Sequence, residues 1–322
     1  MIYLLIVVLL FAILLVYFRI ADKYNIIDKP NQRSSHSVIT IRGGGIVFPK
    51  AMVLFFLFFG MLLPDWRQYL LLLLGMTAIS LVSFWDDVSS LSNKVRILVH
   101  LLSVTVLLYA VQAFRLPFWA VIIAYVMIIG TINAYNFMDG INGITGVYSL
   151  VILLSCLYFN EEIRPVIDSA YIIVPVIACL VFLFFNFRKK AKCFAGDVGS
   201  VSIGFWIISL LLMMILATGD PKYIFFLAVY GVDACLTIAH RILLKQNIFE
   251  AHRLHFYQIL ANERKVPHLW VAVCYGLIQL AVNAVILFTS FNFFVTGLIV
   301  CLPLALIYVL LKPRLMHVKT TL

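Results

Sequence analysis

Long apolar runs alternate with short polar segments along the whole 322-residue chain. Most runs approach the ~20 residues that an α-helix needs to cross the hydrocarbon core of a bilayer. They predict eleven membrane-spanning helices, over residues 2–18, 46–63, 69–85, 97–114, 117–132, 147–159, 170–187, 201–217, 223–244, 268–288 and 293–311. We therefore expect an all-α polytopic membrane protein.

The composition supports this fold class. Hydrophobic residues make up 64% of the chain and charged residues 12%, and the mean hydropathy is +1.08, which excludes an ordinary soluble domain. No linker, low-complexity segment or clear repeat divides the sequence, so we expect one domain over residues 1–322. The six cysteines are scattered, mostly inside apolar runs and without Cys-x-x-Cys spacing, so no disulfide framework is implied.

Basic residues are distributed unevenly between the two sides that the predicted spans define. Of the 24 Lys and Arg residues, 19 follow odd-numbered spans, four follow even-numbered spans, and Lys50 lies near an interface. Because basic residues gather in the cytoplasm, this pattern places the N-terminus outside and the C-terminus in the cytoplasm. The first run has no basic segment before it and no small-residue cleavage site after it, so we interpret it as an uncleaved span. The net charge of +10 is thus a topology signal and not a nucleic-acid patch.

The polar motifs all fall on the predicted cytoplasmic side. The first lies between two apolar runs and carries Asn133, Asn136, Asp139 and Asn142, each three residues apart. On a helix this spacing would place the four side chains on one face. Their hard oxygen atoms suit Mg2+ and a phosphorylated substrate. The alternative is a polar turn between helices in which the Asn and Asp side chains act as caps.

Two further carboxylate motifs stand at helix ends. Asp86 and Asp87 close the third span, and because neighbours on a helix point about 100° apart, they can serve different partners. Asp197 opens the eighth span in the sequence Gly196-Asp-Val-Gly-Ser200. There, backbone N–H groups can meet phosphate while the carboxylate holds Mg2+, although a simple helix cap would use the same residues.

A third motif supplies cationic or neutral donors. His252 and His255 stand three residues apart with Arg253 between them, which suits a phosphate or pyrophosphate clamp. Zinc is the alternative, but no third ligand is evident nearby. With no nucleotide-binding loop or Ser/His/Asp array in competition, the motifs favour phosphoryl transfer between a soluble anionic donor and a lipid acceptor.

Taken together, the motifs resemble those of the polyprenyl-phosphate N-acetylhexosamine-1-phosphate transferases, glycosyltransferase family 4. The resemblance runs nearly end to end. It rests on Asp28-Lys-Pro-Asn-Gln-Arg-Ser-Ser-His36, Gly43-Gly-Gly45, Asp86-Asp87 with Lys94, Asn133-x-x-Asn-x-x-Asp-Gly140, Gly196-Asp-x-Gly-Ser200, Asp233 and His252-x-x-His255.

The resemblance implies a reaction in which a UDP-N-acetylhexosamine and undecaprenyl phosphate give a polyprenyl-pyrophosphoryl sugar and UMP. It implies Mg2+ as cofactor, with Mn2+ as a substitute, and a bacterial plasma (inner) membrane enzyme whose active site faces the cytoplasm. The product would initiate lipid-linked surface polysaccharide synthesis. Whether the enzyme is a homodimer is left open.

The resemblance also implies roles for single residues. Asp197 would be the principal Mg2+ ligand, with Asn136 as a second contact. Asp86 would accept a proton from the lipid phosphate or orient it, and Asp87 would be its metal- or nucleotide-side partner. The expected substrate contacts are Lys94, His252, Arg253 and His255 for phosphate and Asn133 and Asp139 for nucleotide or sugar.

The sequence departs from the family pattern at two places. Asn142 stands where several relatives have Asp, and the last loop lacks the His triplet of the MurNAc-pentapeptide translocase, which favours the surface-polysaccharide branch. Two other functions are possible. A transporter or lipid flippase should carry several charged residues near the middle of its spans, whereas in this sequence only Asp233 is clearly in the middle of one. A zinc-dependent hydrolase would use His252 and His255, and a metal assay would distinguish it.

Overall fold

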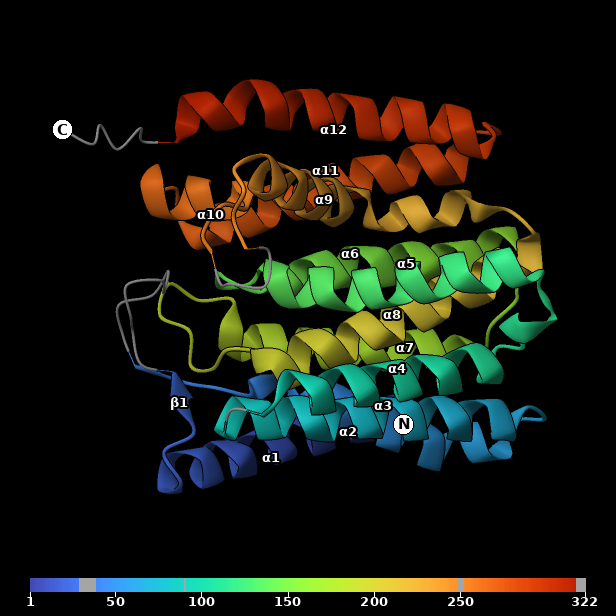
Figure 1. Cartoon of the computed structure of the whole chain (residues 1–322). Coiled ribbons are helices and arrows are strands. Elements are labelled where there is room, and N and C mark those ends of the chain that lie inside the picture. Colours follow the sequence, from blue (N-terminus) through green and yellow to red (C-terminus); the bar gives the residue numbers. More distant parts are fainter. Residues whose placement is uncertain (29–38, 90, 248–251, 317–322) are drawn as a thin grey trace.

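The computed structural model describes residues 1–28, 39–89, 91–247 and 252–316. In this part of the chain the architecture is a bundle of helices joined by short turns (Figure 1). The longer helices are α1 (Ile2–Lys23), α2 (Val47–Phe58), α3 (Trp66–Val88), α4 (Asn93–Ala110), α5 (Phe118–Met138), α6 (Ile144–Tyr158), α7 (Ser169–Asn186), α8 (Gly196–Thr218), α9 (Ala228–Leu243), α11 (His268–Phe288) and α12 (Phe293–Leu315). The shorter elements are η1 (Gly44–Ile46), η2 (Gly60–Leu62), η3 (Ala113–Arg115), η4 (Phe159–Ile163), η5 (Pro221–Leu227), α10 (Phe256–Gln258) and η6 (Ile259–Glu263).

Within the described residues, ten helices are long and apolar enough to cross a membrane, one fewer than expected. The chain is therefore a polytopic membrane protein. The difference lies in the expected span 97–114, which forms α4 and η3. Helix α4 covers Asn93–Ala110, which includes most of that expected span, and it packs along α3 (Figure 1).

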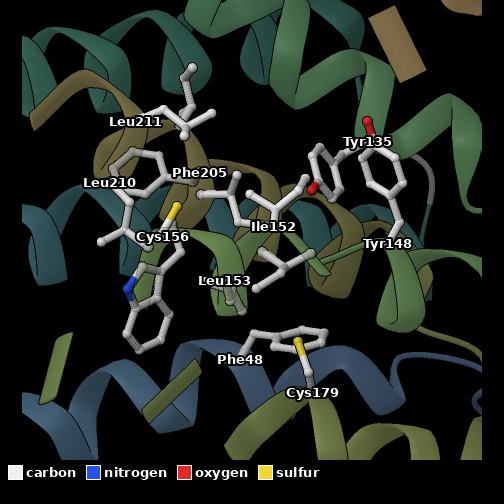
Figure 2. Packing of buried hydrophobic residues seen from close by; sticks show 14 of the residues in the cluster. Phe48, Tyr135, Tyr148, Ile152, Leu153, Cys156, Cys179, Phe205, Leu210 and Leu211 are labelled. Carbon is white, nitrogen blue, oxygen red and sulfur yellow. The ribbon is translucent and has the colours of Figure 1, made fainter. Parts of the chain in front are cut away.

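Helix α8 is the centre of the bundle. Every residue from Val198 to Met214 is buried, and the helix packs against α5 and α6 on one side and α2 and α3 on the other (Figure 1). A helix that is apolar all round is expected only where neighbours cover every face. Figure 2 shows the packing around it, with Phe205, Leu210 and Leu211 of α8 among side chains of α2, α5, α6 and α7. The first turn of α8 is thereby held firmly in place.

Hydrogen bonds between helices supplement this packing. The hydroxyls of Ser80 in α3 and Ser202 in α8 lie 2.7 Å apart, and Asn283 of α11 donates to Ser155 of α6 at 2.9 Å. In a bilayer such contacts and the close approach of small residues hold helices together, because lipid chains are as apolar as the side chains themselves.

A small irregular segment closes one end of the bundle. Strand β1 (Ile27–Asp28) pairs antiparallel with β2 (Thr40–Ile41), and the glycine triplet follows directly. The N–H groups of Gly44 and Gly45 donate to the carbonyls of Phe194 and Ala195 at 2.8 and 3.0 Å. A Cβ atom at Gly45 would lie 2.2 Å from the Cα of Gly199, so only glycine permits this contact between the triplet and α8. Residues 29–36 of the adjoining motif lie outside the described part.

The described polar motifs meet at this same end of the bundle. It carries the last turn of α3, the first turn of α8, the junction of α5 and α6, and α10 (Figure 1). Helices α1 and α12 both run toward it (Figure 1). Which side of the membrane this end faces stays a prediction from the distribution of basic residues.

Candidate active site

Asp87 caps helix α8 from another helix. Its two carboxylate oxygens accept the backbone N–H groups of Asp197 and Val198, each at 3.0 Å, and its side chain has no exposed surface. A helix N-terminus has N–H groups without intrahelical partners and favours negative charge, so this carboxylate satisfies both needs. Gly196 makes the approach feasible, because its φ is +70° and a Cβ there would lie 2.6 Å from an Asp87 oxygen. The contact fixes the backbone of Asp197.

Asp86 has a different environment, in agreement with the expectation that the two neighbours serve different partners. It accepts the N–H of Leu91 at 2.8 Å and pairs with Arg96 at 2.8 Å. About 13% of its side chain is exposed, against none for Asp87, so Asp86 is the more accessible carboxylate.

Two arginines join the three carboxylates into one cluster. Arg42 lies 2.7 Å from Asp87 and 3.4 Å from Asp197. Arg96 reaches from Asp86 to Asp197, the second contact being 3.6 Å. We call this alternating set of five residues the Asp–Arg cluster.

Neither arginine was among the predicted site residues. In the sequence both contribute only to the topology signal, although Arg42 directly precedes the glycine triplet and Arg96 follows the Asp pair in the first turn of the next helix. Lys94, which was predicted to bind phosphate, is exposed in the structure and forms no ion pair among the described residues. Positions two apart on a helix point about 200° apart. The same helical turn therefore brings Arg96, and not Lys94, to the carboxylates.

The asparagine motif divides between a helix and a turn. Asn133 and Asn136 lie on the last turns of α5, but the helix ends at Met138, so Asp139 and Asn142 lie beyond it. The expectation that all four share one helical face is thus met only by the first two. The Nδ2 group of Asn136 donates to Ser200 of α8 at 3.4 Å, which places its amide beside the first turn that carries Asp197.

Asp139 is partly buried in the turn between α5 and α6. The Thr145 hydroxyl donates to it at 2.5 Å. Burial raises the pKa of Asp139 to about 8, and the nearby carboxylates of Asp197 and Asp87 act in the same direction. The side chain therefore retains its proton near neutral pH and can donate a hydrogen bond to a ligand.

Asn142 has a structural role that an aspartate would not reproduce. Its Nδ2 group donates to the carbonyls of Arg188 at 2.8 Å and Lys189 at 3.4 Å. A carboxylate has no N–H group to donate, so an aspartate at this position could not form these two hydrogen bonds to the loop.

Asp233 anchors the histidine loop. It accepts the backbone N–H of Phe256 at 2.9 Å and the Tyr275 hydroxyl at 2.8 Å, and it lies 3.3 Å from Nδ1 of His255. The Tyr257 hydroxyl extends this link to α5 by donating to the Phe137 carbonyl at 2.9 Å. His255 is buried with only 2% of its surface exposed. Asp233, in the middle of α9, thus positions the loop next to the asparagine motif.

His252 is a neutral donor at physiological pH. Its Nδ1 atom accepts the N–H of Leu254 at 3.2 Å. Burial, and to a lesser extent the nearby basic side chains of Arg241 and Lys312, lower its pKa to about 4. Nε2 therefore carries the hydrogen and can donate it to an anion. Arg253 is half-buried on the same loop, and residues 249–251 lie outside the described part.

Comparison with known proteins adds an independent finding. The glycosyl transferase family 4 model matches residues 69–215. The chain belongs to glycosyl transferase family 4. The matched residues of this family 4 transferase run from α3 to α8, and they include the carboxylates of the Asp–Arg cluster, Arg96 and the asparagine motif.

Curated relatives agree with this membership. A probable undecaprenyl-phosphate N-acetylglucosaminyl 1-phosphate transferase of Bacillus subtilis is 28% identical, covering 75% of this chain and 71% of that protein. The undecaprenyl-phosphate alpha-N-acetylglucosaminyl 1-phosphate transferase of Yersinia pestis is 26% identical over 77% and 73%. A phospho-N-acetylmuramoyl-pentapeptide-transferase of Thermotoga maritima is 30% identical, over 50% of this chain and 56% of its own.

The donor set of this family 4 transferase fits a magnesium ion that is completed by substrate. In the described part of the chain, no three His, Cys, Asp or Glu side chains are grouped to hold a metal by themselves. Asp197 keeps 21% of its side chain exposed, and the amide of Asn136 lies beside the same turn. Mg2+ is commonly held by one or two protein oxygens together with waters and substrate phosphates, and these two residues supply that number.

Proposed function

We propose that this family 4 transferase moves an N-acetylhexosamine-1-phosphate, of the GlcNAc type, from a UDP-sugar to undecaprenyl phosphate and releases UMP. The observation that carries the proposal is the Asp–Arg cluster at one end of a membrane bundle, with its carboxylates inside the family-matched segment. The GlcNAc type is favoured because the relatives named for that sugar align over about three quarters of the chain, whereas the pentapeptide transferase aligns over half.

The chemistry is a single phosphoryl transfer. An oxygen of the lipid phosphate forms a bond to the β-phosphorus of the UDP-sugar, and the bond from that phosphorus to the bridging oxygen breaks, so that UMP leaves. The protein contributes mainly by positioning the two substrates and stabilising their charge. Mg2+ held by Asp197 and Asn136 would neutralise charge on the diphosphate.

The two neighbouring aspartates take different parts in this proposal. Asp87 is committed to the N-terminus of α8, so we assign it the positioning of Asp197. Asp86 is partly exposed, and its partner Arg96 lies at the surface of the bundle, so we assign it the contact with the lipid phosphate. There it would accept a proton from the phosphate or orient the attacking oxygen.

The asparagine motif and the histidine loop would hold the donor. Asp139, as a neutral acid, and Asn133 can contact the nucleotide or sugar. His252 and Arg253 can contact the pyrophosphate, while Asp233 and His255 fix the loop that carries them. The distribution of basic residues supports a cytoplasmic location for this site.

A substrate panel tests the proposal. The purified protein is given undecaprenyl phosphate with UDP-GlcNAc, UDP-GalNAc, UDP-glucose or UDP-MurNAc-pentapeptide, and UMP release is followed with and without Mg2+. We expect release with an N-acetylhexosamine donor only. Release with UDP-MurNAc-pentapeptide alone would contradict the proposed donor, and an unchanged rate in EDTA would contradict the metal.

A further inference from the structure

We propose that Arg42 and Arg96 bind substrate phosphate in addition to the histidine loop, and that each exchanges a carboxylate partner for a substrate phosphate. Arg42 would take the diphosphate of the donor and Arg96 the phosphate of the lipid. This inference rests on the proposed function, because it needs a diphosphate donor, a lipid phosphate and a divalent cation.

Each guanidinium makes one short contact and one longer contact with the carboxylates. Arg42 contacts Asp87 at 2.7 Å and Arg96 contacts Asp86 at 2.8 Å, which are ion-pair hydrogen-bond distances. Their contacts to Asp197 are 3.4 and 3.6 Å, beyond a good hydrogen bond. A guanidinium has five N–H donors, so neither residue is saturated by these contacts, and both side chains are 35% exposed. Each is therefore anchored and still able to bind an anion.

The charges of the Asp–Arg cluster show why these donors matter. With all three carboxylates ionised, they and the two guanidiniums carry a net charge of −1, which repels an incoming phosphate. A divalent cation on Asp197 would change the net charge to +1. Burial lowers the pKa of Arg42, but Asp87 and Asp197 outweigh it and raise the pKa above its usual value, so the residue stays charged. Because Asp197 is the partner that both arginines share, a cation on Asp197 competes with them and frees their outer N–H groups for phosphate.

The places of the two arginines in the fold assign them to different substrates. Arg96 lies on α4, whose neighbouring apolar side chains Ile97 and Leu98 are 66% and 57% exposed, as suits a surface that meets lipid. Arg42 lies away from α4, next to the glycine turn that is held to Phe194 and Ala195 ahead of α8. The Tyr17 hydroxyl also donates to the Arg42 carbonyl at 2.6 Å, which fixes that backbone. A lipid phosphate would thus meet Arg96 first, and a soluble diphosphate would meet Arg42.

Two measurements on Arg42→Gln and Arg96→Gln test the inference. In steady-state assays with UDP-GlcNAc and undecaprenyl phosphate, we expect Arg42→Gln to raise KM for the donor about tenfold or more with little change for the lipid. Arg96→Gln should show the reverse. Arg42→Lys and Arg96→Lys keep the charge and should retain the fold. They lose the planar guanidinium that donates two hydrogen bonds to one phosphate, so each should raise the same KM as its Gln variant, but by less.

The second measurement needs no turnover. Mg2+ is titrated against the melting temperature of the substrate-free protein, and we expect half-maximal stabilisation at a lower Mg2+ concentration in both Gln variants, because a competitor for Asp197 is gone. Lys190→Gln, an exposed residue of the loop between α7 and α8, is the matched control and should behave as wild type.

An unchanged or higher Mg2+ midpoint in the Gln variants would overturn the inference, as would lowered stability with both KM values unchanged. If wild-type protein released no UMP from any donor, the proposed function would fail, and the Mg2+ titration alone would decide whether the arginines compete with a cation.

Discussion

Asp87 offers a direct measure of how the site is held together. Asp87→Ala would leave the N–H groups of Asp197 and Val198 without their acceptors at a buried helix end. Each unsatisfied group costs about 1–3 kcal/mol, so the loss should be about 2–6 kcal/mol, before the unpaired Arg42 is considered. Asp87→Asn keeps one acceptor oxygen and should lose about half as much.

The assay is reversible unfolding in one detergent, with Asp86→Asn as the matched control. Asp86 is partly exposed and accepts only one N–H, from Leu91, so Asp86→Asn should lower stability by about 1 kcal/mol or less. We also expect Asp87→Asn to need more Mg2+ for half-maximal stabilisation, because Asp197 is no longer fixed. Equal stabilities for Asp86→Asn and Asp87→Asn, with turnover lost only in Asp87→Asn, would show that Asp87 acts in the chemistry and would refute the positioning role.

Further predictions concern the metal, the loop and the topology. Asp197→Asn should lower kcat on the order of 100-fold or more, since a full charge beside the metal and pyrophosphate is lost, and near wild-type turnover would contradict this ligand. Arg253→Ala should raise KM for the UDP-sugar far more than for the lipid; the reverse pattern would place the loop at the acceptor. Because the pKa of His252 is lower in the folded state, the unfolded state binds more protons between about pH 4 and 6.5, so stability should rise with pH there, and His252→Gln should flatten that rise. Tags in intact cells should find the N-terminus outside and the C-terminus inside.

The bundle was largely predictable because each crossing of a bilayer requires a long apolar helix, which is visible in one stretch of sequence. Hydropathy does not report how the helices pack. Helix α4 lies along α3 and α8 is covered on every side, and neither arrangement follows from the apolar runs themselves.

The sequence predicts Asp86, Asp87 and Asp197 as site residues from their positions at helix ends, and the structure brings the three together. That Asp87 caps α8 depends on a contact between residues 110 positions apart, and no local pattern reveals it. Arg42 and Arg96 were missed for a related reason: basic residues on this side also follow from membrane topology, so their sequence positions did not separate a structural charge from a functional one.

The most direct test of the proposed transfer is UMP release by purified protein that is given UDP-GlcNAc, undecaprenyl phosphate and Mg2+. We expect release that requires all three and is accompanied by one equivalent of lipid-linked pyrophosphoryl sugar. Absence of UMP and of the lipid product with every UDP-N-acetylhexosamine, in protein that is folded and stabilised by Mg2+, would contradict it.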